Sequence, residues 1–114
     1  MKNYLYCFAL IFLLSCSDND IPRDAPDCVK KVIEGLKKDP VSKPPAKVYQ
    51  YQYEGRTVYY LPPACCDGMS TLMDDDCNVI CSPDGGITGA GDAKCPEFFK
   101  KATNQKLIWE DSRK

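Results

Sequence analysis

The sequence predicts an α+β domain in which one N-terminal helix packs on a small, mainly antiparallel four-stranded sheet, with a glycine-rich loop and disulfides. Three observations support this fold class. Apolar residues recur at helical spacing in residues 26–38, and an aromatic, β-branched stretch with a central turn fills residues 48–61. Cysteines also flank a glycine-rich segment at residues 82–95. Together these patterns indicate one helical layer on one sheet.

The predicted helix spans Pro26 to Lys38. Proline suits the first helical turn, and the lysines at the end of the segment complement the negative end of the helix dipole. Asp39-Pro40 ends the helix. The apolar stripe on one face consists of Val29, Val32, Ile33 and Leu36.

The clearest strand prediction is an antiparallel hairpin over residues 48–61 that turns at Glu54-Gly55. A two-residue turn sets the register. One face then carries the pairs Tyr53 with Arg56, Tyr51 with Val58, and Tyr49 with Tyr60. The other face carries Gln52 with Thr57, Gln50 with Tyr59, and Val48 with Leu61. Because the first face is the more apolar, we expect it to meet the helix.

The remaining segments complete the predicted domain. Residues 70–73 and 78–81 are expected to form a second, shorter hairpin around the acidic turn at residues 74–76. Residues 82–95 contain four glycines and are expected to form a loop. A helical turn is expected at residues 96–101 and a last strand at residues 106–110, with Trp109 as a core or edge anchor.

The first 15 residues have the features of a bacterial lipoprotein signal peptide. Lys2 supplies a positive start, and Tyr4 to Leu14 is an apolar run too short to span a bilayer as an ordinary helix. Leu13-Leu14-Ser15-Cys16 resembles a lipobox, so we expect cleavage before Cys16 and acylation of its thiol. An ordinary signal peptide and an uncleaved membrane anchor are the alternatives. The predicted organisation is a leader at 1–15, a lipidated cysteine and flexible tether at 16–25, and one domain at 26–114.

The four residues after the lipidation site bear on location. Ser17-Asp18-Asn19-Asp20 resembles the export signal of surface lipoproteins of Bacteroidota. It predicts an outer-membrane lipoprotein exposed on the cell surface, with a periplasm-facing position as the alternative. The lipid bilayer, reached through acylated Cys16, is therefore an expected partner.

Cysteine usage follows from this location. Cys7 leaves with the leader and Cys16 is acylated, so an even number remains in an oxidising compartment. These predict up to three disulfides, each contributing about 2–4 kcal/mol. Adjacent Cys65 and Cys66 are expected to take different partners, because bridging neighbours distorts the peptide between them. Cys28 is expected to join one of this pair, and Cys81 to join Cys95. The full set is Cys28, Cys65, Cys66, Cys77, Cys81 and Cys95.

Composition excludes several classes of protein. The expected mature chain has 14 basic and 16 acidic residues and no long basic run, so nucleic acid is not an expected partner. The chain has no histidine, which excludes Ser-His and Cys-His catalysis and removes the commonest metal ligand. No Gly-Lys-Ser/Thr follows the glycines, so no nucleotide is expected.

The acidic turn is the candidate cation site, although no cofactor is required by the sequence. Asp74, Asp76 and Asn78 have a spacing that can direct three oxygens at Ca²⁺. Val79 stands where an EF-hand loop needs glycine and Gly85 where it needs glutamate, so a solvated turn is the alternative. Zinc is not expected, because the cysteines supply one Cys-x-x-x-Cys pair where structural zinc sites use two.

The segment from Pro62 to Pro96 carries a distinctive motif. It reads Pro62-Pro63-x-Cys65-Cys66-Asp67, then Leu72-x-Asp74, then Asn78-x-Ile80-Cys81-x-Pro83-x-Gly85-Gly86-x-Thr88-Gly89-x-Gly91-Asp92, then Cys95-Pro96. This motif resembles a family of small uncharacterised lipoprotein domains of Bacteroidota, with Trp109 as an outlying match. The resemblance implies a shared fold and disulfides, and no catalytic residues, because the family's function is unknown. The element order also resembles that of cystatin and PepSY domains.

These observations favour a non-enzymatic binding module for a glycan or a protein, one form of which is an inhibitor of a secreted hydrolase. The sequence offers no nucleophile–base pair, and its most distinctive segment is a loop pinned by cysteines. The candidate binding-surface residues are Tyr59, Asp84, Thr88 and Asp92. A structural envelope component is the alternative. A hydrolase using paired carboxylates is less favoured, and its candidates are Asp67, Asp74, Asp76, Asp84 and Asp92.

Overall fold

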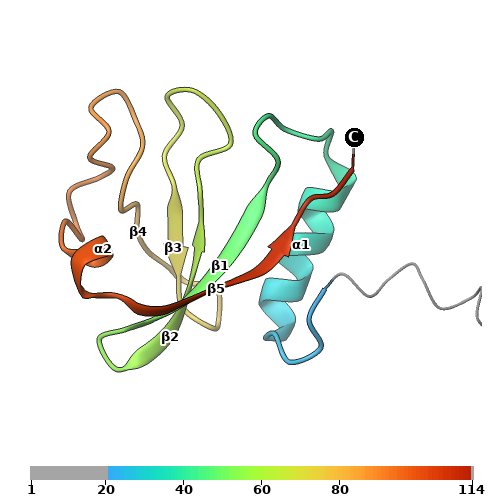
Figure 1. Cartoon of the computed structure of the whole chain (residues 1–114), viewed down its shortest axis with the longest axis horizontal. Helices are drawn as coiled ribbons and strands as arrows, with labels where there is room; N and C mark the ends of the chain where they lie inside the picture. The colour runs from blue at the N-terminus through green and yellow to red at the C-terminus, as the bar shows by residue number, and fades with distance from the viewer. Residues whose placement is uncertain (1–20, 114) are drawn as a thin grey trace, which may run out of the picture.

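The computed structural model describes residues 21–113, which form an α+β domain with an antiparallel sheet (Figure 1). The sheet order is β4-β3-β2-β1-β5. The helices are α1 (Asp27–Lys38) and α2 (Phe98–Lys101). The strands are β1 (Lys47–Tyr53), β2 (Arg56–Leu61), β3 (Thr71–Met73), β4 (Val79–Cys81) and β5 (Thr103–Glu110).

The predicted leader and Cys16 lie outside the described residues. Within residues 21–113, no helix is long and apolar enough to cross a membrane. The longer of the two helices, α1, has 12 residues.

The predicted sheet had four strands, from the two hairpins, whereas the observed sheet has five because the last strand, β5, joins it. Strand β5 begins at Thr103, earlier than the apolar stretch that predicted it, and pairs antiparallel with β1. Its first residues are exposed and polar, so hydrophobic alternation could not reveal them. They pair because the free edge of β1 presents backbone N–H and C=O groups that a neighbouring strand can satisfy.

The predicted hairpin register is confirmed. Tyr49 pairs with Tyr60, Tyr51 with Val58, and Tyr53 with Arg56. The turn residues Glu54 and Gly55 both have positive φ, at 52° and 80°. Two successive positive φ values give the backbone twist that joins adjacent strands through a two-residue turn.

The prediction that the Tyr49–Tyr51–Tyr53 face meets the N-terminal helix is wrong. Helix α1 packs on the opposite face, where Val29 and Ile33 are fully buried. The aliphatic stripe of α1 meets strand residues that are themselves apolar or aromatic on that face. These strand residues are Val48, Tyr59, Met73, Ile108 and Trp109.

The tyrosine face is covered instead by the short helix α2 and the segment leading to it. Phe98 is fully buried, and its ring centroid lies 5.0 Å from those of Tyr51 and Tyr53. The sequence prediction compared only the apolar residues on the two faces of the hairpin. That comparison could not show that α2, a helix of four residues, covers the tyrosine face. The sheet therefore has a core on each face, and Figure 1 shows the strands between α1 and α2.

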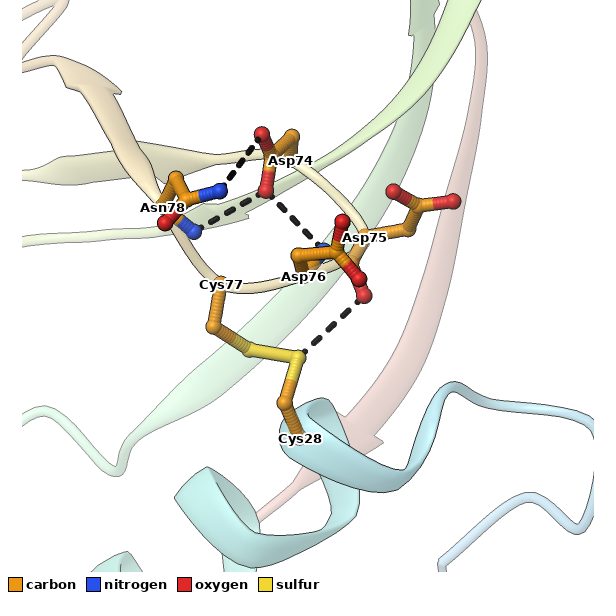
Figure 2. The surroundings of a disulfide bond; sticks show 6 residues. All are labelled: Cys28, Asp74, Asp75, Asp76, Cys77 and Asn78. Carbon is orange, nitrogen blue, oxygen red and sulfur yellow. Dashed lines mark hydrogen bonds between the residues drawn. A yellow bond between two sulfur atoms is a disulfide. The ribbon is translucent and has the colours of Figure 1, made fainter.

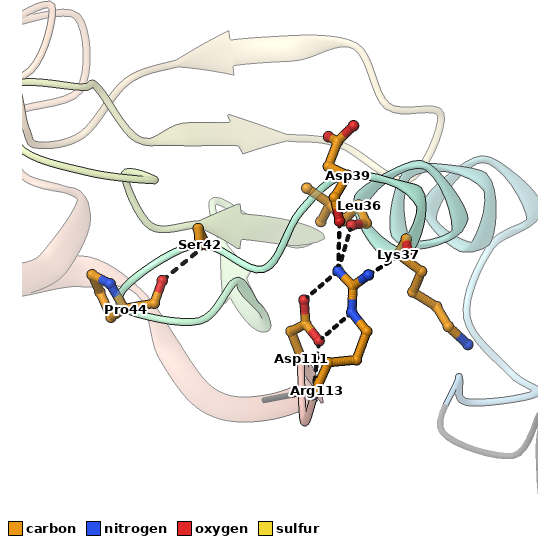
Figure 3. Close-up of polar contacts among 7 residues, drawn as sticks. All are labelled: Leu36, Lys37, Asp39, Ser42, Pro44, Asp111 and Arg113. Atoms are coloured by element: carbon orange, nitrogen blue, oxygen red, sulfur yellow. Dashed lines mark hydrogen bonds and ion pairs between the residues drawn. The ribbon is translucent and has the colours of Figure 1, made fainter.

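The C-terminal segment is fastened to the end of α1 (Figure 3). The Arg113 guanidinium donates hydrogen bonds to the carbonyl oxygens of Leu36, Lys37 and Asp39, at 3.2, 2.7 and 2.9 Å. The buried Asp111 carboxylate orients that guanidinium through two further hydrogen bonds. These contacts satisfy carbonyls that a helix C-terminus leaves without intrahelical partners.

Candidate functional site

An apolar pocket lies where the proline-rich connector after α1 passes the ends of β1 and β2. Its volume is about 190 Å³. The walls come from two segments, residues 42–47 and residues 61–64, with Tyr49 and Leu36 completing them. Each segment contains two consecutive prolines, which fix φ and hold the chain in extended or turn geometry. The proline walls are Pro44, Pro45, Pro62 and Pro63.

Few polar groups line this pocket. The Ser42 hydroxyl donates a hydrogen bond of 2.9 Å to the carbonyl oxygen of Pro44, which uses that hydroxyl within the wall itself (Figure 3). Lys47 contributes a positive charge among the lining residues. The arrangement can therefore hold an apolar group, with one cation beside it.

The segment that closes the pocket continues into the adjacent cysteines. Pro63 packs against the glycine-rich loop, since a Cβ added at Gly85 would lie 3.1 Å from Pro63 Cγ and 2.9 Å from Met69 Cα. The Gly86 N–H donates a 3.0 Å hydrogen bond to the Gly68 carbonyl oxygen. Gly85 also has φ of 92°, so both its conformation and its surroundings require glycine. The pocket wall and the glycine-rich loop thus form one continuous structure.

All six cysteines of the domain are paired, as Cys28–Cys77, Cys65–Cys66 and Cys81–Cys95. The expected Cys81–Cys95 link, which closes the glycine-rich loop, is present. The expectation that Cys65 and Cys66 take different partners is wrong. These two share a tight turn in which the Gly68 N–H donates to the Cys65 carbonyl oxygen at 2.8 Å, and Cys66 has φ of 58°.

Cys28 joins Cys77 rather than one of the adjacent pair (Figure 2). The reason is the side of the sheet on which α1 packs, because that face brings Cys28 to the acidic turn between β3 and β4. The Cys28 sulfur also lies 3.2 Å from the Asp75 carbonyl oxygen. The disulfide therefore ties the start of α1 to the tip of the second hairpin.

The acidic turn is organised by its own backbone (Figure 2). Asp74 Oδ1 accepts hydrogen bonds from the N–H groups of Asp76 and Asn78, each at 2.9 Å. These bonds, led by that from Asn78, hold the Asp74 carboxyl pKa below its ordinary value. Asp74, Asp75 and Asp76 can place one carboxylate oxygen each within 4.8 Å of one another, so calcium remains a hypothesis for this turn.

The candidate binding-surface residues do not form one surface. Tyr59 was expected to offer an exposed ring and is buried beneath α1 instead, which corrects that prediction. Asp84 faces inward and accepts a hydrogen bond of 2.8 Å from the Tyr60 hydroxyl. Thr88 is exposed, and Asp92 is half-buried and accepts from the Lys94 N–H.

The sequence analysis did not predict the pocket or the residues that line it. The two proline-rich stretches at residues 40–47 and 62–63 were visible, but nothing in the sequence says that they lie side by side. The β1–β2 register, which the sequence does predict, brings Tyr49 opposite Tyr60 and so places the chain before β1 near the chain after β2. That pairing is the signal from which the pocket could have been found.

Comparison with known proteins places the chain in one family. The model of the family DUF6970, described as a domain of unknown function, matches residues 34–111. The chain therefore belongs to the DUF6970 family. No curated protein matches the chain, and no solved structure matches it either.

Proposed function

We propose that this domain is a non-enzymatic binding module that captures an apolar side chain of a protein ligand in the pocket between residues 42–47 and 61–64. The observation that carries the proposal is the pocket itself, whose volume of about 190 Å³ is below the range of about 300–1,000 Å³ typical of sites for drug-sized ligands. A pocket of this size suits one side chain or one sugar ring of a larger ligand. The mostly apolar lining favours the side chain.

The rigidity of the walls supports the same proposal. Proline-rich segments and disulfide-linked turns lose little conformational freedom when a ligand binds, so more of the interaction energy appears as affinity. Interfaces commonly depend on a few anchor side chains that fill such pockets. A glycan ring stacked on Tyr49 is the other ligand consistent with the lining.

The test uses a variant that fills the pocket. Ala64 lines the pocket and is exposed, so Ala64→Trp should block the pocket without disturbing either core. Ala90→Trp, at an exposed position of the glycine-rich loop, is the matched control. We expect saturable binding of the domain to a member of a panel of secreted proteins, lost by at least tenfold (about 1.4 kcal/mol) in Ala64→Trp and retained in Ala90→Trp.

Other outcomes of that panel contradict the proposal in different ways. Binding that is lost in Ala90→Trp alone would move the site to the glycine-rich loop, and binding only to glycans would exclude a protein ligand. Turnover abolished by one Asp→Asn change among the carboxylate candidates would show an enzyme. No binding at all would favour a structural envelope component.

We also propose that the domain is an outer-membrane lipoprotein of Bacteroidota, anchored through acylated Cys16 and exposed on the cell surface. The sequence features at residues 13–20 support this, and three disulfides are compatible with an oxidising compartment. Cys16→Ala should leave the precursor uncleaved and unlabelled by palmitate, and normal processing of that variant would contradict the anchor. Surface protease treatment of intact cells distinguishes the two leaflets.

A further inference from the structure

The Cys65–Cys66 disulfide differs from the other two in its exposure. Cys65 and Cys66 are both exposed, whereas Cys81 and Cys95 are buried. The remaining disulfide, Cys28–Cys77, is half-buried between α1 and the acidic turn. In thiol–disulfide exchange, an attacking thiolate must reach a sulfur atom directly. The exposure of Cys65 and Cys66 therefore favours exchange at their disulfide over the other two.

The same disulfide contributes little to stability through loop closure. The stabilising effect of a disulfide in the unfolded chain grows with the number of residues that it encloses. Cys65 and Cys66 are neighbours in sequence, so their bond encloses no loop, while the other two enclose separations of 49 and 14 residues. Its opening therefore leaves the fold's main covalent links intact.

The position of this disulfide connects it to the pocket. Ala64, Pro63 and Pro62 line the pocket and directly precede Cys65. On the other side, Gly68 is held to the glycine-rich loop through its carbonyl oxygen. Residues 62–68 thus form a short bridge between a binding pocket and a fixed anchor, with the disulfide in the middle.

We propose that Cys65–Cys66 is a thiol–disulfide exchange site whose redox state sets the shape of the pocket. The exchange partner is a protein or small molecule carrying two thiols. One partner thiolate attacks a cysteine sulfur, forming a mixed disulfide and releasing the other cysteine as a thiolate. The second partner thiol, after losing its proton, attacks the mixed disulfide. The partner leaves as a disulfide, and the chain gains two electrons and two protons as the Cys65 and Cys66 thiols.

Reduction changes the pocket because it frees the backbone of the bridge. Cys66 has φ of 58°, a left-handed conformation that non-glycine residues rarely adopt. Once the bond to Cys65 is open, Cys66 can return to negative φ and turn the peptide that leads to Ala64. The effect on ligand affinity rests on the proposed function, whereas the exchange and the change in pocket shape do not.

The test uses the oxidised chain from residue 17, which retains both cores and all six paired cysteines. Graded dithiothreitol, followed by alkylation and peptide mapping, identifies the cysteines reduced first. We expect Cys65 and Cys66 to be alkylated at a dithiothreitol concentration about tenfold or more below that needed for the other four. Reduction of another pair first, or of all three together, would overturn the exchange site.

Nuclear magnetic resonance of the same samples detects a change in pocket shape without a ligand, through the chemical shifts of methyl groups. We expect the methyl resonances of Ala64 and Leu61 to shift on selective reduction, while those of Val58 and Ile108 in the two cores stay in place. The double variant Cys65→Ala/Cys66→Ala should show the shifts at Leu61 without any reductant. Unchanged pocket resonances after complete reduction of this pair would refute the link to the pocket. Failure to find a protein ligand would contradict the proposed function, but it would not affect the evidence for selective reduction or for the change in pocket shape.

Discussion

Two buried tyrosines of the hairpin, Tyr51 and Tyr60, have hydrogen-bonded hydroxyls. Tyr60 donates to Asp84 Oδ1 at 2.8 Å, and Gln105 Nε2 donates to the Tyr51 hydroxyl at 2.9 Å. A buried hydroxyl without a partner is costly, so these contacts allow tyrosine where phenylalanine would be the simpler core residue. The Asp84 contact also ties the start of the glycine-rich loop to the middle of the sheet.

Tyr60→Phe should therefore destabilise the domain. The change removes the donor to a charged carboxylate, and hydrogen bonds to charged groups contribute about 1.5–3 kcal/mol. We expect the free energy of unfolding to fall by about 1.5 kcal/mol, measured by urea denaturation. Tyr53→Phe is the matched control, because Tyr53 lies in the same core and makes no contact with Asp84 through its hydroxyl. Equal losses in the two variants would contradict a special role for the Asp84 bond.

Because four tyrosines of the hairpin are buried, we expect the domain to lose stability at alkaline pH. Burial is the main cause that raises the pKa values of Tyr51, Tyr53, Tyr59 and Tyr60 above the ordinary value of about 10. The folded protein thus holds protons that the unfolded chain releases, so this contribution to stability is complete below about pH 10 and declines as pH rises above it. Urea midpoints measured from pH 8 to 11 should fall above pH 10, with a smaller decline in Tyr60→Phe. A midpoint that rises in this range would refute the prediction.

Helix α2 is small, and Phe98 is the buried residue of this helix. Phe98 is fully buried among Tyr51, Tyr53 and Tyr60, while the neighbouring Phe99 is half exposed. Phe98→Ala should cost about 3–5 kcal/mol, because it leaves a cavity in the core of the tyrosine face. Phe99→Ala, the matched control, should cost roughly 1 kcal/mol or less. Thermal unfolding followed by circular dichroism measures both, and similar losses would show that α2 is not held by Phe98.

At the scale of elements, local patterns were sufficient for some predictions and not for others. The Glu54-Gly55 turn fixed the hairpin register because side chains alternate with a period of two, so one correct turn determines every pair. The choice of face for α1 depends on what else covers the sheet. Phe98 covers the tyrosine face and leaves the opposite face for α1. Phe98 is far from the hairpin in sequence, and its helix is too short to show a periodic pattern.

Two of the three disulfides were not predicted from the sequence for the same reason. Cys81–Cys95 encloses a local loop and was predictable, whereas Cys28–Cys77 depends on the packing of α1. The vicinal pair depends on a turn whose geometry follows from Cys66 and Gly68 together. The apolar pocket likewise needed the relative placement of two proline-rich segments, which no single segment encodes.

The three disulfides should contribute to stability in a definite order. With the loop-closure relation, the sequence separations of 49 and 14 residues correspond to about 4 and about 3 kcal/mol. Paired Cys→Ala variants should therefore lose most stability for Cys28/Cys77, less for Cys81/Cys95 and least for Cys65/Cys66. Thermal melting of the three double variants measures this order. A larger loss for Cys65/Cys66 than for Cys28/Cys77 would contradict it.

At the scale of the whole molecule, the folded unit is longer than the family match. The DUF6970 match begins at residue 34, near the end of α1, and ends at residue 111. It leaves out Cys28, Val29 and Ile33, although Val29 and Ile33 are fully buried against the sheet. It also leaves out Arg113, which caps the C-terminus of α1. The core on the α1 face therefore depends on residues on both sides of the match.

A chain cut to residues 34–111 should consequently fail to fold cooperatively. The cut exposes the apolar side chains beneath α1, including Val48 and Tyr59, and leaves Cys77 without Cys28. We expect no sigmoidal urea transition, and one alkylatable thiol by intact mass. Residues 21–114 are the positive control, and residues 34–111 with Cys77→Ala separate the loss of packing from the free thiol. A truncated chain that unfolds with the same midpoint as the control would show that the tyrosine-face core alone supports the domain.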